Sequence, residues 1–167
     1  MKKIETERKF IIKKPLLQLI GEQENFTESE ITQIYLNDKE ITHRVRARKY
    51  SDGSVELTEN TKRRISAMSV IETERKISES EYEALAAMRD ARTEPLCKIR
   101  RTFTFFGKTF ELDFYREWER TCIMEVEMNG EDEKIEFPPF IEIICEVTGD
   151  KAYSNHSMSA LFPREII

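Results

Sequence analysis

Glycine, histidine and cysteine are all scarce in this chain, and each scarcity excludes a class of site. None of the five glycines falls in a GxGxxG or Walker-type loop that could hold nucleotide phosphates on backbone amides. The two histidines belong to no Ser-His-Asp or Cys-His grouping, so no nucleophilic catalytic set is visible. No apolar run reaches membrane-spanning length, and the charged N-terminus does not resemble a signal peptide. We therefore expect a cytoplasmic protein without a membrane partner.

Three cysteines, Cys97, Cys122 and Cys145, stand among apolar or strand-like neighbours and form no CxxC pair. This pattern predicts buried free thiols in a reducing compartment. The composition, with 39% hydrophobic and 35% charged residues over 167 positions, predicts a single domain spanning 1–167 with a real core. The net charge of -5 gives no reason to expect nucleic acid as a partner.

Segments with a period of two residues dominate the chain and predict strands. Short turn sequences separate them, such as the Asp-Gly pair at 52–53 and the Asn-Gly pair at 129–130. Such connections favour an antiparallel meander over a parallel sheet with helical crossovers. The predicted strands span residues 3–12, 31–37, 41–50, 54–62, 69–77, 97–106, 109–116, 122–128 and 141–147.

Three helices are predicted to accompany these strands. The clearest covers residues 79–92, where Ser78 opens a capping box. A shorter helix is expected at 15–20, and another begins at residue 154 or 155 and stops before Pro163.

Almost every predicted strand has one ionised face and one apolar face. In THRVRARKY, three arginines oppose Val45 and Ala47, and in IMEVEM two glutamates oppose apolar residues. An open sheet with its charged face in water is the simplest interpretation of any one such strand. The charges are segregated by strand, however, whereas a solubilising surface mixes both signs. Together with eight or nine hairpin-connected strands, this favours a mainly β (α+β) protein: a closed antiparallel barrel with a charged lumen and a few covering helices.

One heptapeptide almost repeats: IETERKF at 4–10 returns as IETERKI at 71–77. In a strand each copy holds two carboxylates side by side, as does MEVEM at 124–128. Crowded carboxylates repel unless a divalent cation lies among them, and hard cations such as Mg²⁺ prefer carboxylate oxygen. Crowded arginines and lysines need an anion in turn, and polyphosphate suits them. A metal ion together with a polyphosphate would account for both kinds of cluster.

The order of these motifs resembles that of the CYTH family, also called triphosphate tunnel metalloenzymes. This family includes class IV adenylyl cyclases, thiamine triphosphatases and inorganic triphosphatases. Its N-terminal ExExK motif is matched at residues 5–9. The further matches, in chain order, are VRARKY, VIETERKIS before the capped helix, CKIRRTF, FELDFY, IMEVEM and CEVTGDKAYSN. The resemblance covers nearly the whole chain and implies a tunnel-shaped barrel.

The resemblance also implies a role for each charged position. One or two Mg²⁺ or Mn²⁺ ions would be held by five carboxylates, Glu5, Glu7, Asp113, Glu125 and Glu127. A triphosphate would be bound by five basic residues, Arg46, Arg48, Lys62, Lys98 and Arg100. Lys9, the expected catalytic residue, would lie close to the reacting phosphorus or orient the attacking water.

Some assignments stay open at this point. The family carries a TxK motif where this chain has Asn60, so Lys62, which faces the same way, would take that phosphate contact. The further candidates are Arg44, Glu72 and Glu74. Arg44 shares a face with the other two arginines of its strand, and the two glutamates either contact a metal or form ion pairs with the basic residues.

The implied reaction is metal-dependent hydrolysis of a triphosphate by in-line attack of water. Inorganic triphosphate is the expected substrate, because it needs only charge. A class IV adenylyl cyclase, a thiamine triphosphatase and a non-catalytic polyphosphate or nucleotide-binding module are the alternatives. The expected partner is thus a small triphosphate such as inorganic triphosphate, ATP or thiamine triphosphate, bound by a monomer or a homodimer.

Overall fold

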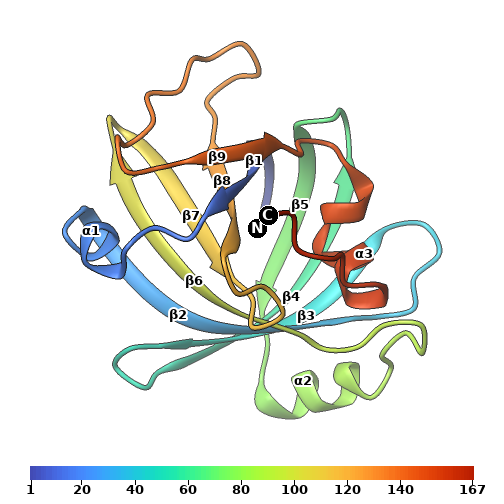
Figure 1. Cartoon of the computed structure of the whole chain (residues 1–167). Helices are drawn as coiled ribbons and strands as arrows, with labels where there is room; N and C mark the ends of the chain where they lie inside the picture. The colour runs from blue at the N-terminus through green and yellow to red at the C-terminus, as the bar shows by residue number, and fades with distance from the viewer.

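The computed structural model describes residues 1–167, and its strands form one antiparallel sheet of nine strands (Figure 1). Eight of them follow the order β5-β4-β3-β2-β6-β7-β8-β1, and the pairing of β1 with β5 closes the ring. The ninth strand, β9, pairs with β1 alone. The predicted closed antiparallel barrel is therefore confirmed.

The strands alternate with short turns along most of the chain. They are β1 (Lys2–Lys13), β2 (Glu24–Tyr35), β3 (Thr42–Tyr50), β4 (Val55–Arg64), β5 (Ser69–Lys76), β6 (Leu96–Phe105), β7 (Lys108–Phe114), β8 (Thr121–Glu127) and β9 (Ile143–Glu146). The helices are α1 (Leu17–Gly21), α2 (Glu79–Ala86), α3 (Asn155–Ala160) and the 3₁₀ turn η1 (Lys151–Tyr153). None of these helices is both long and apolar enough to cross a membrane.

β1 is shared by three neighbouring strands. Its residues 7–13 pair with β8 along one edge. On the other edge, residues 2–6 pair with β5 and residues 10–12 pair with β9. Neither ladder covers residues 7–9 on that edge, so the barrel wall has a seam there.

The outward faces of β1, β6, β7 and β8 form the main apolar core. Its members include Phe10, Phe103, Phe110, Leu112 and Met124, all buried. The long segment 129–142, between β8 and β9, covers this face with Ile135, Phe137, Phe140 and Ile141. The alternation thus turns the apolar side of these strands outward against a loop, and their charged side inward.

A second core closes one end of the barrel beneath α3. Leu96, Tyr115, Trp118 and Ile123 pack there with Met158 of α3. Ile123 shares a strand face with Glu125, so the inward face of β8 changes from charged to apolar along its length.

Several boundaries differ from the sequence predictions. α2 ends at Ala86 instead of residue 92, because the chain turns away so that the Asp90 N–H donates to the Tyr35 carbonyl at 2.9 Å. β2 begins at Glu24, seven residues before the predicted start, in a polar stretch with no apolar alternation. The prediction of three buried thiols is wrong, since Cys122 is buried but Cys97 is exposed and Cys145 only half-buried.

Candidate active site

The charged strand faces meet in a cavity of about 540 Å³ inside the barrel. Nine lysines and arginines and eight glutamates line it, and Tyr35 and Val70 are its only hydrophobic residues. The predicted site residues in this lining are Glu5, Glu7, Lys9, Arg44, Arg46, Arg48, Lys62, Glu72, Glu74, Arg100, Glu125 and Glu127. Lys98 and Asp113 are not part of it.

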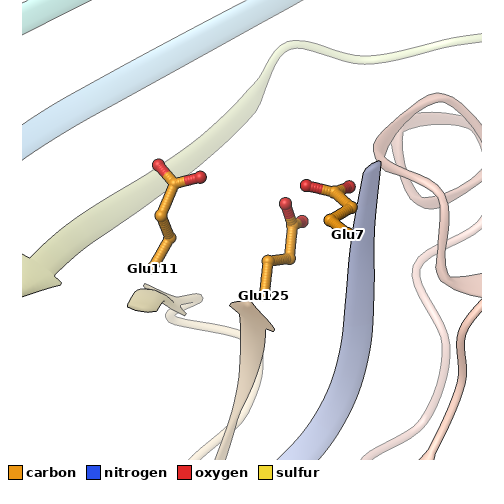
Figure 2. Close-up of side chains that lie close together, drawn as sticks. All are labelled: Glu7, Glu111 and Glu125. Atoms are coloured by element: carbon orange, nitrogen blue, oxygen red, sulfur yellow. The ribbon is translucent and has the colours of Figure 1, made fainter. Parts of the chain in front are cut away.

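Three carboxylates converge on one side of the cavity. Glu7 of β1, Glu111 of β7 and Glu125 of β8 can each offer an oxygen within 4.8 Å of the others (Figure 2). Strand register explains the convergence, because Glu125 lies opposite both Lys9, two residues from Glu7, and Glu111. Glu111 was missed by the sequence analysis, although it shares a strand face with Asp113.

The crowding changes how these carboxylates hold protons. Burial and the neighbouring Glu125 carboxylate raise the pKa of Glu7 well above its ordinary value. Burial also opposes ionisation of Glu125, but the Lys9 and Arg100 charges outweigh it and hold the pKa of Glu125 well below its usual range. The Glu7–Glu125 pair therefore favours holding a proton. Oxygen donors that repel in this way are the ligand set that a hard divalent cation fits.

The arginines of β3 are buried without full satisfaction. Arg44 and Arg46 each keep a buried Nε that has no hydrogen-bond partner. Burial and the adjacent charges of Arg44 and Arg100 lower the pKa of Arg46. Its nearest carboxylate contact, to Glu74, is long at 3.7 Å. Unpaired buried donors of like charge are the expected mark of a site for an anion.

Lys9 lies between the carboxylate cluster and the C-terminal segment. Its Nζ is 3.5 Å from Glu125 Oε1 and donates to the Tyr153 carbonyl at 3.2 Å. Because its strand face is shared with Glu7, the ammonium group extends into the same part of the cavity.

No protein-family model and no curated protein sequence matches the chain. Among solved structures it is similar to the inorganic triphosphatase NE1496, with 26% identity, a TM-score of 0.60, and coverage of 95% of this chain and 99% of that chain. A second structure of NE1496 gives 25% identity with the same coverage and TM-score. Together with the closed barrel, this similarity supports a CYTH domain. The PH1819 protein from Pyrococcus horikoshii OT3, at 19% identity and a TM-score of 0.57 over 77% of this chain and 80% of that chain, shares the fold.

The CYTH motif with asparagine in place of lysine can now be located. Lys62 enters the cavity and its Nζ lies 3.2 Å from Glu5 Oε2 and 3.3 Å from Glu72 Oε2. The buried amide of Asn60 instead donates to Glu72 at 3.2 Å and to Glu74 at 3.1 Å. In this structure Glu72 therefore forms an ion pair with Lys62, one of the two roles that the sequence left open.

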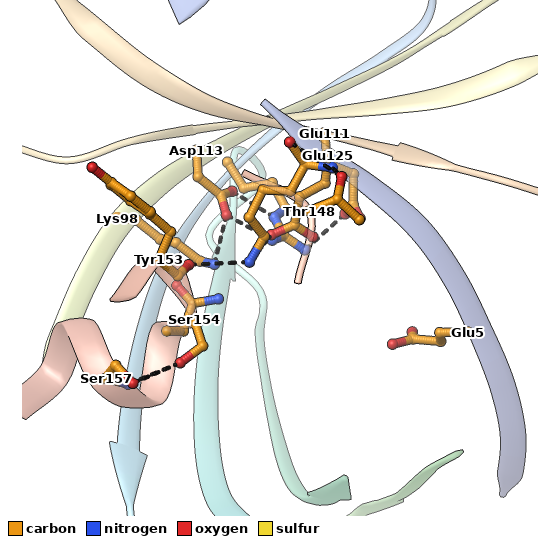
Figure 3. Close-up of polar contacts among 12 residues, drawn as sticks. Glu5, Lys98, Glu111, Asp113, Glu125, Thr148, Tyr153, Ser154 and Ser157 are labelled. Atoms are coloured by element: carbon orange, nitrogen blue, oxygen red, sulfur yellow. Dashed lines mark hydrogen bonds and ion pairs between the residues drawn. The ribbon is translucent and has the colours of Figure 1, made fainter. Parts of the chain in front are cut away.

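The KxR strand places Lys98 outside the cavity lining, and its side chain lies against Asp113 (Figure 3). Lys98 Nζ donates to Asp113 Oδ2 at 2.7 Å, and Arg100 donates to both Asp113 oxygens at 2.7 and 2.8 Å. The Lys98 and Asp113 side chains are 0% and 1% exposed. Burial opposes ionisation of Asp113, but the charges of Arg100 and Lys98 outweigh it and lower the pKa of Asp113. Asp113 is thus engaged by two cations. Glu111, to which Arg100 also donates at 2.7 Å, lies beside Glu7 and Glu125, where the sequence had placed Asp113.

Proposed function

We propose that this CYTH protein is a divalent-metal-dependent hydrolase of inorganic triphosphate. The observation that carries the proposal is the presence of two kinds of crowded charge in one cavity. Three glutamates converge within 4.8 Å of one another, with Lys9 contacting Glu125 and Arg100 contacting Glu111, and Arg44 and Arg46 each keep a buried Nε without a hydrogen-bond partner. A metal-bound polyphosphate would stabilise both groups at once. The similarity to NE1496, an inorganic triphosphatase, supports the same chemistry.

Each group in the cavity has a role in this proposal. Glu7, Glu111 and Glu125 would hold Mg²⁺ or Mn²⁺, which when bound would neutralise charge on the phosphate oxygens. The phosphates would be bound by basic residues of the lining, Arg44, Arg46, Arg48, Lys62 and Arg100. Lys62 would exchange its present carboxylate partners for phosphate, and Lys9 would orient the reacting phosphate or the water.

The reaction is a transfer of the terminal phosphoryl group to water. The water oxygen forms a bond to the terminal phosphorus, and the bridging P–O bond breaks with its electron pair going to diphosphate. The water loses one proton to solvent. The guanidinium groups stabilise the charge that develops on the phosphate oxygens, and no covalent intermediate with the protein is required.

The lining favours inorganic triphosphate over an organic ester. A nucleobase or a thiamine ring needs apolar or aromatic surface, and binding sites for such groups are mostly hydrophobic. Here Tyr35 is only 1% exposed, and the ring of His156 packs against it with centroids 5.0 Å apart. Val70 is the one aliphatic residue of the lining. Over most of the cavity, only charged groups are therefore available to recognise a substrate.

The test measures phosphate release and cyclic AMP formation side by side. Inorganic triphosphate, thiamine triphosphate and ATP are supplied in turn, each with Mg²⁺, with Mn²⁺ and with excess EDTA. We expect the highest kcat/KM with inorganic triphosphate, and no turnover in EDTA while circular dichroism remains unchanged. Full turnover in chelator would refute the metal dependence. Cyclic AMP as the main product from ATP would identify a cyclase. Binding of triphosphate without turnover would identify a binding module.

A further inference from the structure

A second, smaller cavity of about 40 Å³ lies at the seam of the barrel wall. It is bounded by the β4–β5 turn at 65–68 and by the segment that follows β9. Glu7, Lys9 and Ser154 line both this side chamber and the main cavity. The side chamber therefore adjoins the carboxylate cluster from a different direction.

The chamber exists because β1 changes partners. Between its β5 and β9 ladders the backbone bonds are made by loops: the Glu7 N–H donates to the Met68 carbonyl at 3.1 Å, and the Val147 N–H donates to the Lys9 carbonyl at 2.8 Å. The Lys9 N–H donates to Thr148 Oγ1 at 2.9 Å. At residues 7–9 of β1 the wall on this edge therefore consists of two loops instead of a strand.

The two loops frame the chamber closely. Gly149 has a φ of +73°, and a Cβ added to it would lie 3.0 Å from the Ala67 Cβ. Gly149 is thus required both by its backbone conformation and by the approach of the β4–β5 turn. A larger side chain at Ala67 would press into this junction.

The size and lining of the chamber suit water. A water molecule needs about 10–15 Å³ of such volume and two to four polar partners, so a chamber of about 40 Å³ admits two or three. Glu7, Lys9, Asp150 and Ser154 supply carboxylate, ammonium and hydroxyl groups. The main cavity is more than ten times larger and is the one that can hold a triphosphate.

We propose that the side chamber holds and delivers the water that attacks the triphosphate. This inference rests on the proposed function. A triphosphate and its metal ion would occupy the main cavity, and the seam gives water its own route to Glu7 and Lys9. The delivered water forms the new P–O bond and loses its proton to solvent, as in the hydrolysis described above.

The experiment narrows the chamber with Ala67→Leu and widens it with Met68→Ala. The matched control is Ala91→Leu, an equal substitution at an exposed turn outside both cavities. Triphosphate hydrolysis is followed as kcat and KM, and the ratio of methyl phosphate to phosphate is measured in dilute methanol. We expect Ala67→Leu to lower kcat about 10- to 100-fold with little change in KM. Ala67→Leu should also lower the methyl phosphate share, Met68→Ala should raise it, and the control should do neither.

The outcomes separate the two proposals. A folded Ala67→Leu variant with unchanged kcat and product ratio overturns the water route while leaving the proposed function intact. If Ala67→Leu does not fold, an unchanged ratio of methyl phosphate to phosphate in Met68→Ala is enough to overturn the water route. A wild-type protein that does not hydrolyse triphosphate defeats the proposed function, and the water route with it.

Discussion

Two clusters of buried charge lie together in this barrel, and they differ in how completely they are satisfied. In the closed cluster, Lys98 and Arg100 both donate to Asp113 at 2.7 Å. The open cluster consists of Glu7, Glu111 and Glu125, with Arg44 and Arg46 in the same cavity. Its three carboxylates crowd together with only Lys9 and Arg100 in direct contact, and the two arginines keep buried Nε donors without partners. Both clusters arise from strands with the same alternation. Fully satisfied buried charge supports the fold, whereas incompletely satisfied buried charge is typical of a binding site.

The largest effect should come from removing a carboxylate of the open cluster. Glu125→Gln should lower kcat by about 10³-fold, since a bound metal ion contributes several kcal/mol to stabilising transition-state charge. Raising the metal concentration should restore part of the activity. The free energy of unfolding should also fall, because Lys9 and Arg100 stabilise the ionised Glu125 carboxylate in the folded protein, so kcat is measured where both proteins are fully folded. The control is Glu30→Gln, an exposed carboxylate of β2, and an active, metal-indifferent Glu125→Gln would contradict the assignment.

In the closed cluster the main effect should be on stability. Asp113→Asn leaves Lys98 without a carboxylate, while Arg100 keeps its 2.7 Å contact with Glu111. We expect the free energy of unfolding, measured in urea, to fall by about 3 kcal/mol, the lower end for a broken buried ion pair. The metal concentration for half-maximal activity should stay the same. A large shift in that concentration at full stability would instead favour the sequence-based assignment of Asp113 as a metal ligand.

Arg46→Ala tests the anion side of the open cluster. A charge-assisted hydrogen bond is worth about 1.5–3 kcal/mol, so KM for triphosphate should rise about 10- to 100-fold. Some loss of kcat is expected as well, because such contacts tighten in the transition state. Initial rates over a matrix of metal and triphosphate concentrations separate this variant from Glu125→Gln. Rescue of Arg46→Ala by metal, but not of Glu125→Gln, would mean that the two sides are assigned the wrong way round.

The smallest effect concerns a satisfied carboxylate outside both clusters. Glu165 accepts hydrogen bonds from the N–H groups of Glu119, Arg120 and Thr121 at 2.6–3.0 Å. Partial burial opposes ionisation of Glu165, but these hydrogen bonds, of which that from the Arg120 N–H has the largest effect, lower the pKa of Glu165. Its stabilising contribution is therefore present above the unfolded pKa and is lost as pH falls through the lowered one. Glu165→Gln should cost about 1 kcal/mol at pH 7 and nothing in strong acid, with kcat unchanged. A cost that is the same at both pH values would contradict this.

Most of the barrel was predictable from local pattern. Alternation located the strands because side chains of successive residues point to opposite faces, whatever the strand pairs with. The two errors in element boundaries, at the start of β2 and the end of α2, have one cause. The start of β2 is polar, and α2 stops where the Asp90 N–H finds the Tyr35 carbonyl, so both boundaries are set by neighbours in space.

The chemistry of each strand face follows from local sequence: carboxylates on β1 and β8, arginines on β3, and an apolar side that needs a cover. Which charges meet depends on how the strands pair. Register and barrel closure bring Glu111, not Asp113, beside Glu7 and Glu125, and they enclose Lys98 with Asp113 outside the cavity lining. Which side chains share a face is fixed within one strand, because successive side chains point to opposite sides. The partner across the barrel depends on how all eight strands pair, and no single strand carries that information.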